Sequence, residues 1–234
     1  MNTEQKIRYA RQIAVSEISK KGQEKLLNAK VLIIGCGALG SMVAMQLAGA
    51  GVGCLGLADF DKIDISNLQR QFFFKTSDTG FLKAQKIAIA INELNPEIKV
   101  KVFTEMIISK KADILFREYD FIIDATDNPD SKRMTGNISK KVGKPCCIGG
   151  VRDFQGQVMT FLPDDPRFED YFGNVSDNSF LPCSLGGVIG SAAALCASIQ
   201  ASETIKYLTS AGDLLSGKLL LFNLLTNSFR LISL

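Results

Sequence analysis

Two hydrophobic patterns alternate along most of the chain. Short apolar runs of about four to eight residues are typical of buried strands, whereas apolar residues every three or four positions are typical of helices that cover a sheet. The runs predict strands at Lys30–Ile34, Cys54–Ala58, Ile98–Phe103, Tyr119–Ala125, Cys146–Gly149, Gln157–Leu162, Lys218–Leu224 and Ser228–Leu234. The helical spacing predicts helices within residues 4–28, after Gly40 through Ala50, and over Thr79–Leu94, Lys110–Arg117, Ser131–Val142 and Gly187–Leu208. Strands that alternate with helices indicate an α/β domain.

One polar segment interrupts this alternation. Residues 163–182, PDDPRFEDYFGNVSDNSFLP, contain three prolines and five acidic residues and follow neither period. A loop of this length in a compact domain is either functional or disordered. We interpret its acidic residues as solvated loop charge rather than as a partner contact.

A glycine-rich turn follows the first predicted strand and opens a helix. Residues 35–40, GCGALG, match G-x-G-x-x-G: Gly35 permits the tight turn, Gly37 lets the backbone approach a phosphate or ribose, and Gly40 allows close packing of helix on strand. Asp59 ends the next strand and is expected to accept hydrogen bonds from ribose hydroxyls. This βαβ unit predicts a Rossmann-like, doubly wound mixed sheet, mostly parallel with antiparallel C-terminal strands. The turn alone fits a dehydrogenase as well as an ATP-dependent enzyme.

Several further polar side chains follow in the segment Asp59–Gln71, DFDKIDISNLQRQ. A dehydrogenase needs only the first acid, whereas a nucleoside triphosphate brings about four negative charges that cations must neutralise. Arg70 can fork onto phosphate oxygens, and Asn67 and Gln71 can orient a ribose or phosphate oxygen. Lys83, at the start of the next helix, supplies a second cation. The segment therefore favours a triphosphate site.

Asp127 follows the strand Tyr119–Ala125, and the carboxyl ends of parallel strands meet at one edge of a sheet. A carboxylate beside a triphosphate is unfavourable unless a metal lies between them, so Asp127 is a predicted Mg²⁺ ligand. Asp61 and Asn128, beside the two strand ends, complete the predicted cofactor-binding set.

Composition narrows the chemistry. The chain has no histidine, which excludes Ser-His-Asp and Cys-His catalysis and histidine-ligated metals. A net charge of +3 is too mild to predict a nucleic acid or membrane partner. The N-terminus has no apolar signal core, and the longest small-apolar stretch, Leu185–Ile199, is too short to span a bilayer, so we expect a cytoplasmic protein.

The six cysteines form no C-x-x-C pair, so we expect no zinc, and disulfides are not expected in a cytosolic chain. Five of them lie in apolar surroundings and are interpreted as core residues; Cys183 does not.

Taken together, these elements resemble the ThiF/MoeB/HesA family, the bacterial relatives of ubiquitin-activating enzymes. The match covers nearly the whole chain in order, and the combination of S-N-L-Q-R-Q with T-D-N is highly specific. The matching motifs are R-Y-A-R-Q-I at Arg8–Ile13, GCGALG, A-G-V-G at 50–53, S-N-L-Q-R-Q at 66–71, G-x-x-K at Gly80–Lys83, A-T-D-N at 125–128, V-R-x-x-x-G-Q at 151–157, G-V-I-G-S at 187–191, E-T-I-K at 203–206 and the C-terminal S-G-K. The resemblance implies a single adenylation domain over 1–234, with N-terminal helices (4–28), a nucleotide-binding core (30–162), a crossover loop (163–186) and a C-terminal helix and strands (187–234).

The resemblance further implies ATP-dependent adenylation of the C-terminal glycine of a small ubiquitin-like sulfur carrier ending in Gly-Gly. A ThiS-type carrier of thiamine biosynthesis is favoured over a MoaD-type carrier of molybdopterin biosynthesis. In the family, residues matching Asp59, Asn67, Arg70 and Lys83 contact the nucleotide, and the residue matching Asp127 serves Mg²⁺. A histidine-free chain suits this chemistry, because the nucleophile is a carboxylate already ionised at neutral pH.

Two residues are implied by the resemblance alone. The residue matching Arg11 reaches the partner's site across a homodimer, where it would act like an arginine finger. Cys183 lies in the crossover loop, where some family members carry a cysteine that links covalently to the carrier. Many members also bind zinc through two C-x-x-C pairs, which this chain lacks.

Other functions fit parts of the pattern. A NAD-dependent oxidoreductase would use the glycine turn and Asp59, because the cofactor carries its chemistry. A tRNA-nucleoside dehydratase, disfavoured by the weak basic balance, and a peptide-adenylating enzyme belong to the same family. A non-catalytic partner subunit would have no need of the intact Arg70, Lys83 and Asp127.

Overall fold

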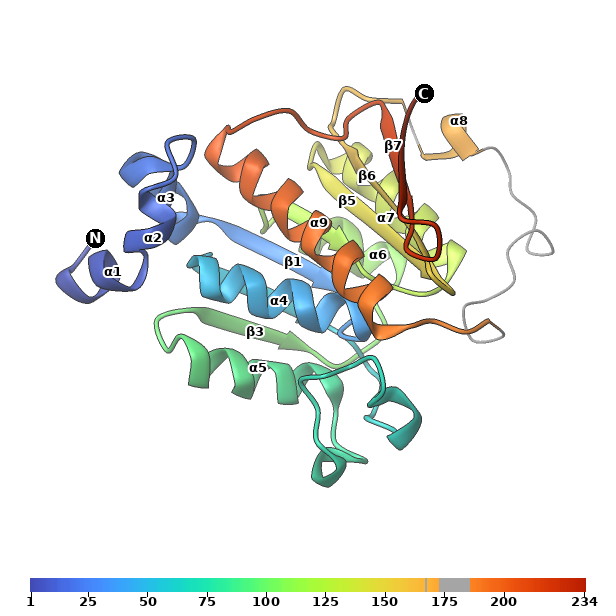
Figure 1. Cartoon of the computed structure of the whole chain (residues 1–234), viewed down its shortest axis with the longest axis horizontal. Helices are drawn as coiled ribbons and strands as arrows, with labels where there is room; N and C mark the ends of the chain where they lie inside the picture. Colours follow the sequence, from blue (N-terminus) through green and yellow to red (C-terminus); the bar gives the residue numbers. More distant parts are fainter. Residues whose placement is uncertain (167, 173–185) are drawn as a thin grey trace.

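The computed structural model describes residues 1–166, 168–172 and 186–234. Within these residues, eight strands form one sheet in the order β3-β2-β1-β4-β5-β6-β7-β8 (Figure 1). The strands are β1 (Lys30–Ile34), β2 (Cys54–Ala58), β3 (Lys99–Phe103), β4 (Phe121–Asp124), β5 (Cys146–Arg152), β6 (Gln155–Phe161), β7 (Lys218–Asn223) and β8 (Ser228–Ser233). The first five in sheet order run parallel, and β6, β7 and β8 each run antiparallel to their neighbours. The predicted mixed, doubly wound sheet is confirmed.

Helices cover both faces of the sheet, as the apolar runs of the central strands require. The helices are α1 (Thr3–Arg8), α2 (Ala10–Ile13), α3 (Ser19–Asn28), α4 (Ala38–Ala50), α5 (Lys83–Leu94), α6 (Ser109–Phe116), α7 (Pro129–Val142), α8 (Phe168–Phe172) and α9 (Gly190–Thr209), with 3₁₀ turns η1 (Ile65–Asn67) and η2 (Thr76–Asp78). Helices α4, α5 and α9 pack on one face around the larger hydrophobic core, and α6 and α7 pack on the other (Figure 1). The order of β1 and β4 about the centre of the sheet makes their carboxyl ends the topological switch point, where α/β proteins bind ligands.

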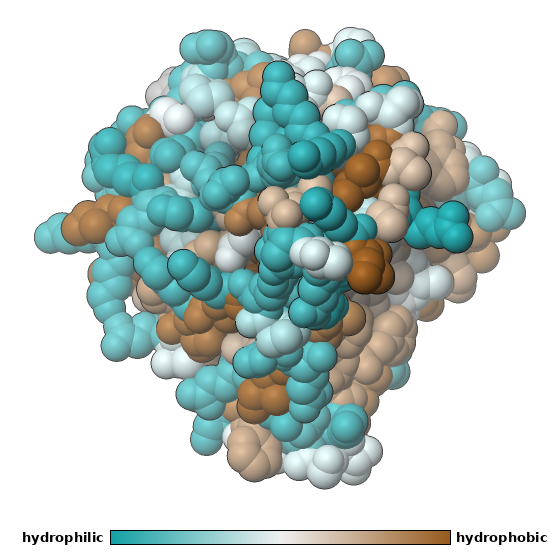
Figure 2. Space-filling model, turned by 90° about the vertical axis from the view of Figure 1, so that its left-hand side faces the viewer, coloured by the Kyte–Doolittle hydropathy of each residue, from teal (hydrophilic) through white to brown (hydrophobic). Residues whose placement is uncertain are grey.

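The N-terminal helices expected within residues 4–28 are α1, α2 and α3. The break between α1 and α2 falls at Tyr9, whose ring is buried against Gly51. Gln12 and Gln23 both donate to the carbonyl of Ala50, at 2.9 Å each. The segment bends so that these side chains reach the C-terminal end of α4. Figure 2 shows the molecule from this side, where hydrophilic residues cover most of the visible surface.

Other boundaries shift for local reasons. Helix α5 begins at Lys83 rather than Thr79, because Thr76–Asp78 form the turn η2, in which the side chain of Asp78 accepts from the amide of Lys75 at 2.9 Å. Helix α7 begins at Pro129 rather than Ser131, with Asn128 as its N-cap.

The composition of the polar segment 163–182 predicted a loop, but part of the segment is helical. It contains α8, whose Phe168 and Tyr171 rings lie 5.8 Å and 6.0 Å from the ring of Phe161. Packing of these aromatic rings stabilises a short helix, which the acidic residues of the segment make hard to predict from the sequence.

No helix in the described part of the chain is long and apolar enough to span a membrane.

Candidate nucleotide-binding site

One pocket of about 560 Å³ lies at the carboxyl ends of β1, β2 and β4, the edge predicted from the sequence. Most of the predicted site residues line it together: Gly35, Gly37, Asp59, Asp61, Asn67, Arg70, Gln71, Lys83, Asp127 and Asn128. The pocket continues past Lys132 to Gly150 and Val151, and then to residues 186–188 before α9. It is therefore an elongated crevice that joins segments far apart in the sequence.

The glycine turn is shaped by close backbone contacts. Gly35 has a φ of 87°, and a Cβ atom built on it would lie 2.9 Å from the carbonyl oxygen of Ala125. A Cβ on Gly40 would lie 1.8 Å from the carbonyl oxygen of Gly35, so this glycine packs α4 onto the turn and does not line the pocket. A Cβ on Gly37 would meet nothing nearer than Nε2 of Gln71 at 3.6 Å. Gly37 is thus the glycine that leaves space for a ligand.

Asp59 is held by the turn itself. Its two carboxylate oxygens accept from the amides of Cys36 at 2.6 Å and Asp61 at 2.7 Å. Burial raises the pKa of Asp59, and these two hydrogen bonds and the nearby ammonium of Lys83 act against that rise. The carboxylate is oriented at the end of β2 and still lines the pocket, as a ribose-binding group requires.

Lys83 is buried at the N-terminus of α5, and its ammonium lies 2.8 Å from Oδ2 of Asp61. The Asp61 side chain is half exposed, and both residues line the pocket. The carboxylate therefore holds the ammonium in place while the ammonium stays accessible to a ligand. Arg70 donates one guanidinium N–H to the carbonyl of Ser66 at 3.0 Å, and an arginine has five such donors. Two cations therefore line one wall of the crevice.

The 3₁₀ turn η1 presents the remaining polar groups of this wall. The side chain of Asp64 caps the turn, and the Asn67 side chain returns a hydrogen bond by accepting from the Asp64 amide at 3.2 Å. Asn67 is therefore partly occupied by this local capping. Gln71 is buried, and its Oε1 atom has no hydrogen-bond partner among the described residues. An unpartnered buried acceptor beside the crevice suits a donor supplied by a ligand.

Asp127 lies on the opposite wall, in the turn between β4 and α7. Its side chain is exposed and has no hydrogen bond or ion pair within the described part of the chain. Asn128 has a second role that the sequence did not predict, since its side chain caps α7 by accepting from the amide of Ser131 at 2.8 Å.

The donor set fits Mg²⁺ that arrives with a nucleotide. Among the described residues, no group of three or more His, Cys, Asp or Glu side chains could hold a metal alone. Mg²⁺ is commonly held by one or two carboxylates together with substrate phosphates, and Asp127 supplies such a carboxylate.

One ion pair in this site was not predicted from the sequence. Lys132, on α7, lines the crevice and contacts the fully buried carboxylate of Asp124 at 3.1 Å. The available signal was an acidic residue inside an apolar strand, followed eight positions later by a lysine. That pattern also fits surface residues, and only the packing of α7 on β4 brings the two charges together.

Arg11 does not line the pocket. Arg11 is exposed on α2, between the anchored side chains of Tyr9 and Gln12. Cys183 lies outside the described residues. Of the five other cysteines, Cys54 is half-buried and Cys36, Cys146, Cys147 and Cys196 are buried, as predicted for core residues.

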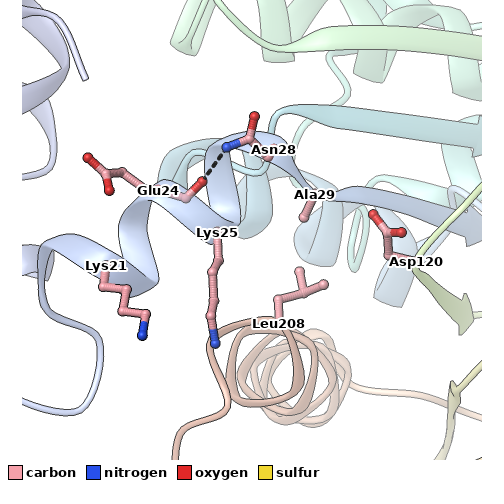
Figure 3. A pocket seen from close by; sticks show the side chains of 7 residues that line it. All are labelled: Lys21, Glu24, Lys25, Asn28, Ala29, Asp120 and Leu208. Carbon is pink, nitrogen blue, oxygen red and sulfur yellow. Dashed lines mark hydrogen bonds between the residues drawn. The ribbon is translucent and has the colours of Figure 1, made fainter.

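A second pocket, of about 520 Å³, lies between α3 and the end of α9, beside the start of β1 (Figure 3). Its side chains serve the fold. Lys25 donates to the carbonyl of Thr209 at 3.2 Å and to the hydroxyl of Ser210 at 3.0 Å, which caps the C-terminus of α9. Asn28 donates to the carbonyl of Glu24 at 2.7 Å, the dashed line in Figure 3.

The fold and the crevice define a class: a doubly wound α/β domain with a polar ligand site at its switch point. The ThiF family model matches residues 9–234, and the chain belongs to this family.

Three relatives illustrate the range of the match. The chain is 36% identical over 239 residues to the probable adenylyltransferase/sulfurtransferase MoeZ of Mycobacterium tuberculosis, covering 100% of this chain and 61% of MoeZ. It is 34% identical to a probable molybdopterin-synthase adenylyltransferase of Gracilaria tenuistipitata, and the match covers 95% of this chain and 63% of that relative. It is 33% identical to the sulfur carrier protein adenylyltransferase of Thermus thermophilus, covering 95% and 85%. The chain thus spans less than two thirds of the first two relatives.

Solved structures share the fold. PaaA superposes with a TM-score of 0.83 at 25% identity, covering 100% of this chain and 74% of PaaA. Escherichia coli MccB with ATP superposes with a TM-score of 0.83 at 23% identity, covering 100% and 72%.

Proposed function

We propose that the protein uses MgATP to adenylate the C-terminal carboxylate of a small ubiquitin-like sulfur-carrier protein. The observation that carries the proposal is the crevice itself. The cations Arg70 and Lys83 form one wall, and the unpartnered carboxylate of Asp127 faces the same space. A dinucleotide site needs Asp59 and the glycine turn but not this charged set. The names of the relatives MoeZ and sulfur carrier protein adenylyltransferase support the same chemistry.

The reaction asks little of the protein beyond positioning and charge. The carrier carboxylate attacks the α-phosphorus of ATP, a bond forms between carboxylate oxygen and phosphorus, and pyrophosphate leaves with the electron pair of the broken bond. No proton must be removed, so a chain without histidine can catalyse the step. Asp59 orients the ribose, and Lys83 and Arg70 stabilise negative charge that moves toward the leaving group. Bound Mg²⁺ would neutralise phosphate oxygens, with Asp127 as its protein ligand.

The far end of the crevice supports a narrow acyl substrate. It is lined by Gly150, Gly186 and Gly187. These glycines lie beside Val151 and Val188 and add no side chains of their own, so they leave room for an extended glycine tail, which suits a carrier that ends in Gly-Gly. The relatives' names do not favour the ThiS-type carrier expected from the sequence, because two of them name molybdopterin synthase. Both carrier types are therefore candidate substrates.

ATP–pyrophosphate exchange tests the proposal directly. The purified chain would be incubated with MgATP, labelled pyrophosphate and either a ThiS-type or a MoaD-type carrier, with the same carriers lacking the last glycine as controls. We expect exchange only with an intact Gly-Gly end. Asp127→Ala should lower the rate at least ~100-fold, as loss of an electrostatic contact to the reacting phosphates typically does. The control Asp130→Ala, an exposed acid in the first turn of α7, should stay within about twofold. Saturable NADH binding without exchange would favour the oxidoreductase instead.

Our proposal includes a homodimer in which Arg11 acts in the partner's site. The support is that Arg11 is exposed on a segment whose neighbours Tyr9 and Gln12 are firmly anchored. Arg11→Ala and Asp127→Ala should each be inactive alone. After random subunit exchange, half of the dimers are mixed and each has one intact site, so the mixture should regain about a quarter of wild-type activity. Lys6→Ala, at another exposed cation of the N-terminal helices, serves as the control for Arg11→Ala. A mixture that stays inactive would refute action in trans.

Absence of zinc remains a prediction, which metal analysis of the purified protein would test.

A further inference from the structure

The ion pair of Lys132 and Asp124 lies directly beneath the turn that carries Asp127. The Asp124 side chain is completely buried at the end of β4, and the Lys132 side chain is 13% exposed. One oxygen of Asp124 accepts from the amide and the hydroxyl of Thr126, at 3.1 Å and 2.8 Å. The other oxygen accepts from the hydroxyl of Thr135 at 2.8 Å. The carboxylate therefore links α7 to the start of the turn.

Lys132 uses all of its hydrogen-bonding capacity inside the protein. Its ammonium donates to Oδ1 of Asp124 at 3.1 Å, to the carbonyl of Thr126 at 2.7 Å and to the carbonyl of Gly149 at 2.7 Å. An ammonium has three donors, so none is left for a phosphate without breaking one of these bonds. Although Lys132 lines the crevice, its role differs from that of Lys83 or Arg70.

The three acceptors come from three separate segments. Asp124 belongs to β4, Thr126 to the turn, and Gly149 to β5. Lys132 thus ties the turn to the neighbouring strand. On the other side of Asp127, Asn128 is fixed as the cap of α7. The exposed carboxylate of Asp127 is held between two anchored residues while it makes no contact of its own in the described part of the chain.

We propose that Lys132 is a positioning residue of the adenylation site: its ammonium clamps the turn Thr126–Asn128 to β5 and so fixes Asp127 toward the reacting phosphates. This inference rests on the proposed function. It assigns to Lys132, which no sequence motif marks, the task of holding the predicted metal ligand in place. The consequence is specific: loss of the clamp should slow the chemical step more than it weakens ATP binding, because Asp59 and the glycine turn hold the nucleotide independently.

Two measurements on the full chain test the clamp. Hydrogen–deuterium exchange without nucleotide reports order in residues 125–131, and ATP–pyrophosphate exchange reports kcat and KM. In Lys132→Met we expect amide exchange in 125–131 to quicken at least ~10-fold and kcat to fall at least ~10-fold, with KM for ATP within about threefold. Lys132→Arg keeps the charge and should restore both values to within about threefold of wild type.

Two controls separate positioning from general destabilisation. Thr135→Val removes a hydrogen bond from the same carboxylate but touches neither Thr126 nor Gly149, so it should lower Tm while leaving exchange in 125–131 and kcat within about twofold. Because Lys132→Met leaves Asp124 buried and unpaired, the pair Lys132→Met with Asp124→Asn removes both charges and should recover Tm without recovering turn order or kcat.

The proposal is overturned if the charge-free pair variant keeps wild-type exchange in 125–131 and wild-type kcat, or if Thr135→Val behaves like Lys132→Met. If the wild-type chain supports no pyrophosphate exchange with either carrier, the proposed function fails. The amide-exchange data would still decide whether Lys132 orders the turn, so the two failures are distinguishable.

Discussion

The glycine turn offers a sharp test, because two of its glycines are expected to fail in opposite ways when changed to alanine. In Gly40→Ala the new methyl carbon would lie 1.8 Å from the carbonyl oxygen of Gly35. An ordinary C···O contact is about 3.3 Å, so α4 and the turn must separate by about 1.5 Å. The carbonyl oxygen belongs to the backbone and the methyl carbon is bonded directly to the Cα atom, so neither can rotate away.

The magnitude follows from this geometry. Inserting a methyl group into a packed core typically costs ~1–3 kcal/mol, and a clash with backbone belongs at the upper end or beyond. For a domain of this size each kcal/mol lowers Tm by about 2–4 °C, so Gly40→Ala should melt at least ~6–12 °C below wild type. ATP affinity should fall only as far as the fold is lost, because Gly40 does not line the crevice.

Gly37→Ala should show the reverse. Its methyl group would lie 3.6 Å from Nε2 of Gln71, an ordinary contact, and would occupy the crevice. Replacing an N-cap glycine by alanine costs at most ~1 kcal/mol, so Tm should fall by no more than about 4 °C. The Kd for ATP should rise at least ~10-fold, about 1.4 kcal/mol.

Circular dichroism melts and calorimetric ATP titrations would measure both variants. If Gly40→Ala melted within about 2 °C of wild type, the close-packing argument would be wrong. If Gly37→Ala bound ATP like wild type, the nucleotide would not pass over this turn.

Three further predictions follow from charge and burial. Burial raises the pKa of Asp59, so its ionised form lowers the stability of the folded apo-protein at neutral pH. As the pH falls through that raised pKa, this loss of stability should shrink while the affinity for ATP falls. Measuring Tm and the Kd for ATP of wild type and Asp59→Asn across pH isolates the effect. The Lys86 ammonium, 2.6 Å from Asp78, holds the pKa of that carboxyl below its usual value, so Lys86→Met should lower Tm at pH 7 by up to about 4 °C, with a smaller difference near pH 3; an equal difference at both values would contradict this. Burial raises the pKa of Cys146 and of Cys196 to about 12, so mass spectrometry after iodoacetamide at pH 8 should find both unmodified in the folded protein, and early labelling of either would refute their burial.

Local patterns predicted much of the fold because their causes are local. The apolar run Lys30–Ile34 became β1 with identical bounds, since the four apolar residues after Lys30 are all buried, as in a central strand of a parallel sheet. The glycine turn and the polar segment after Asp59 were recognisable because spacing alone brings them to the ends of β1 and β2. Helix starts were less accurate where capping decided them, as at η2 before α5 and at Asn128 before α7.

The sequence by itself determined the α/β class, the glycine turn and the set of charged side chains that line one crevice, because strand ends and motif spacing are encoded in short stretches of chain. Only the tertiary structure decided which glycine packs the core and which leaves room for a ligand. It also decided that Lys132 meets Asp124, Thr126 and Gly149. Contacts of this kind depend on how a helix settles against two strands, and a buried charge is tolerated only where that packing supplies all of its partners.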